Sequence, residues 1–372
     1  MKKAVKIISY VVVVSLLLSV SVVGVRFFPE LRTMGSLKPI EGTDLYTMEF
    51  FADYHFDEFL EQGASSNIEY YKYVNSIVDN SISIGLSEES TTDACSAFTF
   101  KDSGGRRYMA RNFDYKTNPV MLLVTSPEDA YKSISTVNLN TLGFNTENSP
   151  KMVDLSLFGA PYFPTDGVNE KGISASLLQV NFSRKTKEGS KPTIGIYAAV
   201  RLILDYADTV DKAVELLDDY NMYFDSSLMA HLFVADKLGN SEIIEFVNGE
   251  THVIENFEPY QVASNFNNTE EIFDDDGYVY YKEYSDWLRN SGGTSAYDSE
   301  YSAYIRYDFM RDTLYNSSGI LSVDDAFKLL ENVASPSKLQ YSVVYDMTNL
   351  RATVITDNDW EKKTVAALST AK

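Results

Sequence analysis

Alternating apolar and polar residues dominate the chain after Cys95 and predict short strands joined by tight turns. The segment Phe98–Phe113 predicts a β-hairpin whose turn is Asp102-Ser103-Gly104-Gly105. A predicted turn over Asp166–Gly172 leads into a strand over Ile173–Val180. Further strands are predicted over 232–235, 242–247, 252–254, 341–345 and 352–355.

Apolar residues at helical spacing predict helices between these groups of strands. The helices are expected over 194–206, over 210–217, over 304–315 and from Ser322 onward. Asp208 or Thr209 caps the second, and Ser322 with Asp325 forms a partial capping box for the fourth. The order of the predicted elements along the chain is strands, two helices, strands, two helices and final strands. This order indicates an α+β protein with sheets packed between helix layers. Residues 274–300 are expected to be a mostly irregular connection.

The pattern of apolar and polar residues before Cys95 differs from the pattern after it. This difference divides the chain into three parts. Asp44–Gly63 and Ser65–Leu86 carry helical patterns, and the polar stretch Ser87–Asp93 resembles a linker. Residues 27–94 are therefore expected to be a small helical region, either a stalk or a pro-region. Residues 95–372 form the main domain.

The first 26 residues predict a membrane anchor or a signal segment. A basic start with Lys2, Lys3 and Lys6 precedes Ile7–Val25, which contains no charge and as a helix is about 28 Å long. An uncleaved anchor places the main domain outside the cytoplasm as a single-pass protein of the cell membrane. Cleavage of a signal peptide is the alternative and gives a secreted protein.

Charge excludes several partners. The 372 residues carry 32 Lys and Arg against 53 Asp and Glu, a net charge of −21. No basic run is present to bind nucleic-acid phosphates or an anionic lipid surface. A hydrophobic content of 44% allows a sizeable core. Contact with a membrane is expected through residues 7–25 only, and a homo-oligomer is compatible with the sequence.

Cofactor and metal sites are not expected. Cys95 is the single cysteine, which excludes an intrachain disulfide and a zinc site built on cysteines. His55, His231 and His252 show no metal-ligand spacing and are expected to be structural or surface residues. The acidic residues 270–276 lack the ligand spacing of a calcium loop.

Cys95 stands at the start of a predicted strand, where it acquires special chemistry if the chain is cut before it. A cut between Ala94 and Cys95 leaves a thiol and a free α-amine on one residue. The amine titrates at about 7.7–8.0 and the thiol at about 8.5, so the amine can accept the thiol proton without a histidine. A nearby arginine favours the thiolate, and a carboxylate holds the ammonium form.

Arg111 and Asp114 lie on or just past the return strand of the hairpin that Cys95 begins, so both are candidates for these roles. Residues 111 and 114 point to opposite faces of an ideal strand, so an irregularity or strand end is expected near Asn112. An ordinary cross-strand ion pair is the alternative interpretation of Arg111 and Asp114.

Two motifs carry a resemblance to a known family. Cys95-Ser96-Ala97-Phe98 with Arg111-Asn112-Phe113-Asp114, followed by Asp166-Gly167-Val168-Asn169-Glu170-Lys171-Gly172, resembles the choloylglycine hydrolase family. That family contains bile salt hydrolases and penicillin V acylases and is related to the acid ceramidase group. The resemblance covers roughly residues 95–360. It implies a four-layer αββα N-terminal nucleophile hydrolase that cuts linear amide C–N bonds of N-acyl compounds.

The resemblance also assigns roles by position. It implies Cys95 as nucleophile, Arg111 as partner of the thiolate and Asp114 as ligand of the α-amine. Asn265 resembles the asparagine that donates to the oxyanion. The second oxyanion donor falls on Gln179, and Asn181 lies two residues further on. The alternative for Gln179 and Asn181 is that both are polar strand residues without a catalytic role.

Two features depart from the family. Ser302-Ala303-Tyr304-Ile305-Arg306 has Ala303 where the family commonly has an active-site arginine, so Arg306 or Arg311 is the candidate to compensate. The long leader resembles that of the acid ceramidase group, in which autoproteolysis separates an N-terminal piece that stays bound. Attack of the Cys95 thiol on the Ala94 carbonyl is the corresponding hypothesis here.

Two other functions remain open at the level of sequence. A Cys–His protease needs one of the three histidines beside Cys95, and an inactive exported module uses the same sandwich to hold an acyl ligand. The sequence does not distinguish hydrolysis from acyl transfer, and it leaves the acyl group and the amine of the substrate unspecified.

Overall fold

The structure is a computed structural model that describes residues 27–78, 95–115, 118–180, 183, 189–224, 228–256, 258–269, 286, 302–335 and 337–368. The predicted anchor or signal segment 1–26, the linker Ser87–Asp93 and nearly all of 274–300 lie outside these residues. Within the described ranges, no helix has the length and apolar character needed to cross a bilayer. Anchor and signal peptide both stay predictions.

Nine strands of the described part form a large sheet, here called sheet A. Most neighbours run antiparallel, but β2 and β5 are parallel. In spatial order the strands are β1 (Lys38–Pro39), β2 (Leu45–Phe50), β5 (Val120–Thr125), β6 (Ser133–Asn138), β7 (Pro164–Asn169), β8 (Ile173–Gln179), β11 (Ala230–Asp236), β12 (Ser241–Val247) and β13 (Glu250–Glu255).

A second sheet, sheet B, contains six antiparallel strands of the described part. Their order is β14 (Val262–Ser264), β3 (Ser96–Lys101), β4 (Arg107–Asp114), β15 (Leu339–Asp346), β16 (Arg351–Thr356) and β17 (Thr364–Ala367). A separate parallel pair joins β9 (Thr193–Ile194) to β10 (Asn221–Met222).

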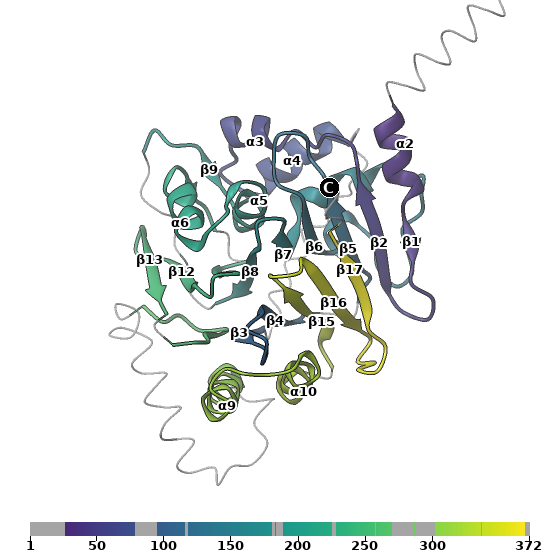
Figure 1. The fold of residues 1–372 in the computed structure, drawn as a ribbon. Helices are drawn as coiled ribbons and strands as arrows, with labels where there is room; N and C mark the ends of the chain where they lie inside the picture. The colour runs from purple at the N-terminus through teal and green to yellow at the C-terminus, as the bar shows by residue number, and fades with distance from the viewer. Residues whose placement is uncertain are drawn as a thin grey trace, which may run out of the picture.

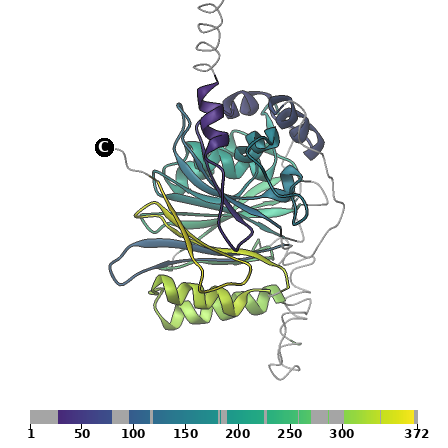
Figure 2. The same ribbon diagram turned by 90° about the vertical axis from the view of Figure 1, so that its right-hand side faces the viewer.

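Helices cover the outer face of each sheet, which gives four layers (Figures 1 and 2). Sheet B carries α9 (Ser302–Asn316) and α10 (Val323–Val333). Sheet A carries α3 (Phe56–Gln62), α4 (Asn67–Ile77), α5 (Ile196–Tyr206), α6 (Val210–Asp218) and the 3₁₀ segments η1 (Leu139–Leu142) and η2 (Leu155–Tyr162). Helix α2 (Phe28–Gly35) precedes β1. The predicted α+β class, with sheets between helices, is confirmed.

Strand alternation divides the buried side chains into three cores. In β3, Ala97 faces the other sheet while Phe98 and Phe100 face α9 and α10. In β8, Leu178 faces sheet B while Leu177 packs under the helices of sheet A. Inner strands such as β3 and β8 therefore bury both faces, whereas the edge strands β1, β13 and β17 stay partly exposed. Cys95 belongs to the core between the sheets.

The predicted helix over Asp44–Gly63 is wrong in its first half. Leu45–Phe50 is strand β2, and only Phe56–Gln62 is helical. β2 pairs with β5 over six residues, and Leu45 and Met48 are buried on opposite faces of sheet A. Burial on both faces produces the broad apolar pattern that the sequence suggests for a helix, so tertiary pairing overrides local preference.

Burial on both faces also hides β5 and β6 from periodicity. In β5, residues 120–124 are a continuous apolar run, and Ser133–Asn138 mixes small polar and apolar residues. The predicted turn over Asp166–Gly172 is shorter than expected, because β7 continues to Asn169. The other predicted strands and the four later helices are confirmed within a few residues, and Thr209 and Ser322 cap α6 and α10.

Candidate active site

Cys95 lies directly before β3, at the edge of the space between the two sheets. Its side chain is 1% exposed. Alternation sends Ser96 to the opposite face of β3, where its hydroxyl accepts a hydrogen bond from Arg306 of α9 at 2.6 Å. The thiol therefore faces sheet A, and the outer face of the same strand end is held by α9.

Arg111 places a cation beside the thiol. The β3–β4 register pairs Arg111 with Ala97, so Arg111 and Cys95 share the inter-sheet face. Its Nη2 lies 3.5 Å from Cys95 Sγ, and its side chain is fully buried. A guanidinium at this distance and in a water-poor environment favours the thiolate form of the cysteine. The proximity that the sequence predicts for these two residues is observed.

Asp166 of β7 fixes the guanidinium from the other sheet. Arg111 Nη1 lies 2.7 Å from Asp166 Oδ2 and also donates to the Thr165 carbonyl at 2.7 Å. The same carboxylate accepts from Thr136 at 2.6 Å, from Tyr341 at 2.6 Å and from Tyr345. A buried ion pair is favourable only when further hydrogen bonds satisfy its carboxylate, and Asp166 meets that condition.

The charge of Arg111 is preserved despite its burial. Burial alone lowers the pKa of the guanidinium, but Tyr341, Asp166 and Cys95 together outweigh burial and raise that pKa above its ordinary value. Phe113 adds its ring face at 4.9 Å from the guanidinium carbon. Arg111 is therefore a fixed positive charge at the sulfur.

Asp114 is the last residue of β4 and is buried. Ser96 pairs with Asn112, so continuing this register places Phe113 opposite Cys95 and Asp114 on its amino-terminal side. β4 ends at Asp114, two residues after Asn112, in line with the expected strand end. A register shift lies in the facing strand β15, between Leu339 and Tyr341. This placement is compatible with a carboxylate that holds the α-amine, and the role itself stays a prediction.

Arg306 of α9 reaches the backbone of the candidate nucleophile. Its Nη1 donates to the Cys95 carbonyl, and its Nη2 donates to Asn265 Oδ1 at 3.0 Å. Arg306 is 2% exposed, whereas Arg311 is half-exposed and pairs with Asp308 and Asp312. Of the two arginines considered as substitutes at Ala303, only Arg306 lies at the site.

Asn265 follows β14 and is oriented by two contacts. Its Oδ1 accepts from Arg306, and its Nδ2 donates to the backbone carbonyl of Gln179 at 2.7 Å. The Gln179 side chain itself is half-buried, and its Oε1 has no hydrogen-bond partner within the described ranges. Asn181 lies outside those ranges. The oxyanion roles of Asn265, Gln179 and Asn181 stay predictions.

Glu245 of β12 is a residue that sequence reasoning missed. The carboxylate accepts from the backbone of Asn268 at 2.7 Å and of Thr269 at 2.9 Å, and from the Thr269 hydroxyl at 2.6 Å. It also contacts His231 Nδ1 at 3.3 Å. Glu245 thereby anchors the segment that carries Asn265. An isolated acidic residue in a predicted strand gives no signal for such a role.

Electrostatics keep Glu245 ionised. Burial raises its pKa, but His231, Thr269 and the backbone of Asn268 outweigh burial and lower the pKa to about 2. His231 is fully buried in this pair, as expected for a structural histidine. His55 is exposed and contacts Asp53 and Glu58 instead. His252 is half-buried on β13.

The motif Asp166–Gly172 has a physical explanation beyond Asp166 itself. A Cβ at Gly167 would lie 2.7 Å from the Ile134 carbonyl, and Gly172 adopts φ +84° beside the Met347 carbonyl. Asn169 Nδ2 donates to the carbonyls of Leu204 and Ala207 at the end of α5. The motif therefore joins β7, β8 and α5 in the orientation that presents Asp166 to Arg111.

No group of three or more His, Cys, Asp and Glu side chains within the described ranges is arranged to hold a metal ion. The chemistry that this part of the structure offers is that of a buried thiol beside a fixed guanidinium, with amide and carboxylate groups nearby. This set suits attack on a carbonyl carbon.

The fold is that of a bile acid hydrolase. Crystal structures of two variants of the conjugated bile acid hydrolase from Clostridium perfringens match with TM-scores of 0.50 and 0.51, each at 14% identity. They cover 73% and 75% of this chain and 92% and 93% of their own. At this identity the match shows the fold alone.

The family follows from the sequence match. The model of the linear amide C-N hydrolases, choloylglycine hydrolase family, matches residues 95–285. This chain belongs to the choloylglycine hydrolase family. A penicillin V acylase from Pectobacterium atrosepticum is 36% identical over 112 residues, which is 27% of this chain and 30% of the relative. That alignment spans under a third of the acylase, and the family match begins at Cys95.

Replacing Asp166 with asparagine tests the buried ion pair between Arg111 and Asp166. Asp166→Asn keeps the size but leaves the buried guanidinium without its counter-charge, which costs roughly 3–5 kcal/mol of unfolding free energy. We also expect hydrolysis of an N-acyl amide to fall by at least about tenfold, because the guanidinium is no longer held at the sulfur. Urea unfolding and kcat/KM measure the two effects.

Asp236→Asn is the matched control for this variant, since Asp236 is equally buried and hydrogen-bonded but caps a distant turn. It should cost stability without lowering kcat/KM of the folded protein. Equal kcat/KM in the two variants would contradict the role of Asp166.

Replacing Glu245 with glutamine tests the anchor of the Asn265 segment. We expect Glu245→Gln to lower the unfolding free energy by about 1–3 kcal/mol at pH 7. Because folding lowers the pKa of Glu245 from 4.5 to about 2, its contribution is present above pH 4.5 and is lost as the pH falls toward 2. The difference between wild type and variant should shrink over that window in urea unfolding.

Glu242→Gln on the same strand is the control, because burial and nearby carboxylates raise the pKa of Glu242. Neutralising it should not destabilise the protein at pH 7. A loss as large as that of Glu245→Gln would assign the effect to strand β12 in general.

Proposed function

We propose that the protein hydrolyses a linear amide C–N bond of a small N-acyl compound, with Cys95 as the nucleophile and its own α-amine as the base. The observation that carries the proposal is the 3.5 Å separation between Arg111 Nη2 and Cys95 Sγ. The start of the family match at Cys95 supports it. Neither a cofactor nor a metal is required.

Maturation must precede this chemistry, because Cys95 follows Ala94 in the chain. The Cys95 thiol attacks the Ala94 carbonyl, the acyl group moves from nitrogen to sulfur, and the peptide C–N bond breaks. Water then hydrolyses the thioester, which leaves a carboxylate on Ala94 and restores the thiol. The products are a free α-amine on Cys95 and a separate upstream piece.

Catalysis repeats the same steps on the substrate. The α-amine takes the thiol proton, the thiolate beside Arg111 attacks the amide carbonyl, and the leaving amine receives the proton. Asp114 is proposed to hold the ammonium form, and the second N–H of Asn265 Nδ2 is proposed to donate to the oxyanion. Such a donor contributes about 10²–10³ in rate. Water then releases the acid.

Residues 27–94 are proposed to be a pro-region that stays bound after the cut. The pairing of β2 with β5 supports retention, as do the hydrogen bonds of Ala64 N to the Thr193 carbonyl and of the Tyr70 hydroxyl to the Tyr162 carbonyl. The Tyr54 hydroxyl donates to buried Asp205 at 2.9 Å. These contacts survive cleavage at residue 94, because none involves the cut bond.

The proposed substrate class is that of small N-acyl amides. The names of similar proteins, conjugated bile acid hydrolase and penicillin V acylase, suggest a steroid and a phenoxyacetyl group as acyl groups to test. A fatty acyl group is the third. Anchoring through residues 7–25, a main domain outside the cytoplasm and a homo-oligomer remain proposals from the sequence.

Replacing Cys95 tests both the cut and the catalysis. Intact-mass analysis of the wild type should show two pieces separated between Ala94 and Cys95, and Cys95→Ala should remain full-length because it lacks the thiol. Hydrolysis of N-acyl amino acids, penicillin V and conjugated bile salts should be lost in this variant. A single full-length species in an active wild-type preparation would refute the cut, and unchanged turnover in Cys95→Ala would refute the thiol mechanism.

Retention of the pro-region predicts that both pieces elute together from a sizing column and separate only in denaturant. Tyr54→Phe leaves Asp205 without one donor, so it should lower the unfolding free energy by about 1–3 kcal/mol and release the upstream piece at lower urea. Tyr46→Phe on β2 is the control, since no hydrogen bond joins its hydroxyl to another residue of the described ranges. Independent elution of the wild-type pieces in buffer would contradict retention.

A further inference from the structure

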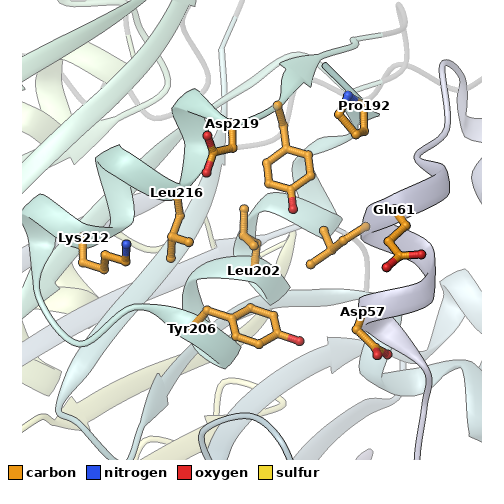
Figure 3. Close-up of a pocket in the computed structure, with 10 residues that line it drawn as sticks. Asp57, Glu61, Pro192, Leu202, Tyr206, Lys212, Leu216 and Asp219 are labelled. Atoms are coloured by element: carbon orange, nitrogen blue, oxygen red, sulfur yellow. The ribbon is translucent and has the colours of Figure 1, made fainter. Parts of the chain in front are cut away.

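A cavity of about 600 Å³ opens on the helix layer of sheet A. Its walls come from α3, α5 and α6 (Figure 3). These helices pack on the face of sheet A that points away from Cys95. Sites for small molecules in proteins commonly measure about 300–1,000 Å³. The cavity therefore has the size of a ligand site and is separate from the candidate active site.

The floor of the cavity is apolar. Leu60 of α3 and Leu202 of α5 are buried, and Leu216 of α6 is half-buried beside them. Figure 3 shows Leu202 between the helix that carries Leu216 and the helix that carries Glu61. An aliphatic chain on this floor gains about 25 cal/mol for each Å² of apolar surface removed from water.

The rim of the cavity is acidic. Asp57 and Glu61 stand one helical turn apart on α3, and Asp219 lies on the opposite wall (Figure 3). Lys212 is the one basic side chain among the described lining residues, and it pairs with Glu215 at 2.9 Å. A cation is attracted to such a rim, and a carboxylate is repelled from it.

Tyr206 adds an aromatic wall to the same cavity. Burial, Asp205 and Asp57 raise the pKa of its phenol to about 12, so the ring is neutral at physiological pH. The face of a neutral tyrosine ring attracts an ammonium group within about 6 Å. An apolar floor, three carboxylates and an aromatic wall are thus combined in one cavity.

We propose that this cavity binds an alkylammonium ion, with the hydrocarbon chain on Leu60, Leu202 and Leu216 and the charged head among Asp57, Glu61 and Asp219. α3 precedes Cys95 in the chain, whereas α5 and α6 follow it. The ligand therefore contacts segments on both sides of the proposed cut and stabilises their association. Binding does not depend on whether the cut or the hydrolysis occurs.

Calorimetric titration of the full-length protein with n-octylamine hydrochloride at pH 7 tests the site. The amine is kept below its micelle concentration and compared with n-octanoate and n-octanol. We expect octylammonium to bind, octanol to bind more weakly and octanoate to give no heat of binding. Octylammonium should bind less tightly as salt is added, because the rim charges are exposed. Equal affinity for octylammonium and octanoate would overturn the proposal.

Paired charge variants place the binding in this cavity. Glu61→Gln with Asp219→Asn removes two rim charges, and Glu58→Gln with Asp218→Asn removes two exposed charges from neighbouring positions outside the lining. We expect the dissociation constant of octylammonium to rise roughly 5- to 10-fold in the first protein and to stay unchanged in the second. An equal change in both proteins, or in neither, would overturn the proposal, because binding at Cys95 is insensitive to these charges.

Discussion

The buried ion pair between Arg111 and Asp166 is the interaction on which the site depends. Both side chains have no solvent exposure, and they come from different sheets. Asp166 also binds the hydroxyls of Tyr341 and Tyr345 on sheet B. The guanidinium is therefore held at the sulfur by the packing of one sheet on the other. A change in sheet spacing at this point moves the guanidinium relative to the Cys95 sulfur.

Around this pair, the site is assembled from strand ends and neighbouring elements. Cys95 precedes β3, Asn265 follows β14, and Arg306 of α9 contacts both the Cys95 carbonyl and Asn265. Glu245 holds the segment after Asn265 from the far strand β12. Each polar group is fixed by a partner on another element, so the site is organised before any substrate arrives. Such preorganisation is the main source of electrostatic catalysis.

The segment before Cys95 is part of the same sheet rather than an appendage. β2 lies inside sheet A, between β1 and β5, and its residues contribute to two of the three cores. A chain that is cut after such a segment loses a covalent bond but keeps the buried apolar surface that holds the pieces together. The fold thus allows the proposed maturation without loss of the sandwich.

The sequence by itself determined the class of fold, the hairpin of Cys95 and Arg111, the caps at Thr209 and Ser322, and the family. These depend on local alternation, turn residues and motif spacing, which the chain carries within short stretches. Only the tertiary structure decided that Leu45–Phe50 is a strand, because its partner β5 is remote in the chain and both faces are buried. It alone also revealed Asp166 and Glu245 as anchors, since their partners lie on other strands and in distant segments. The residues next to a carboxylate in a strand do not indicate which buried cation or backbone N–H group the carboxylate will bind.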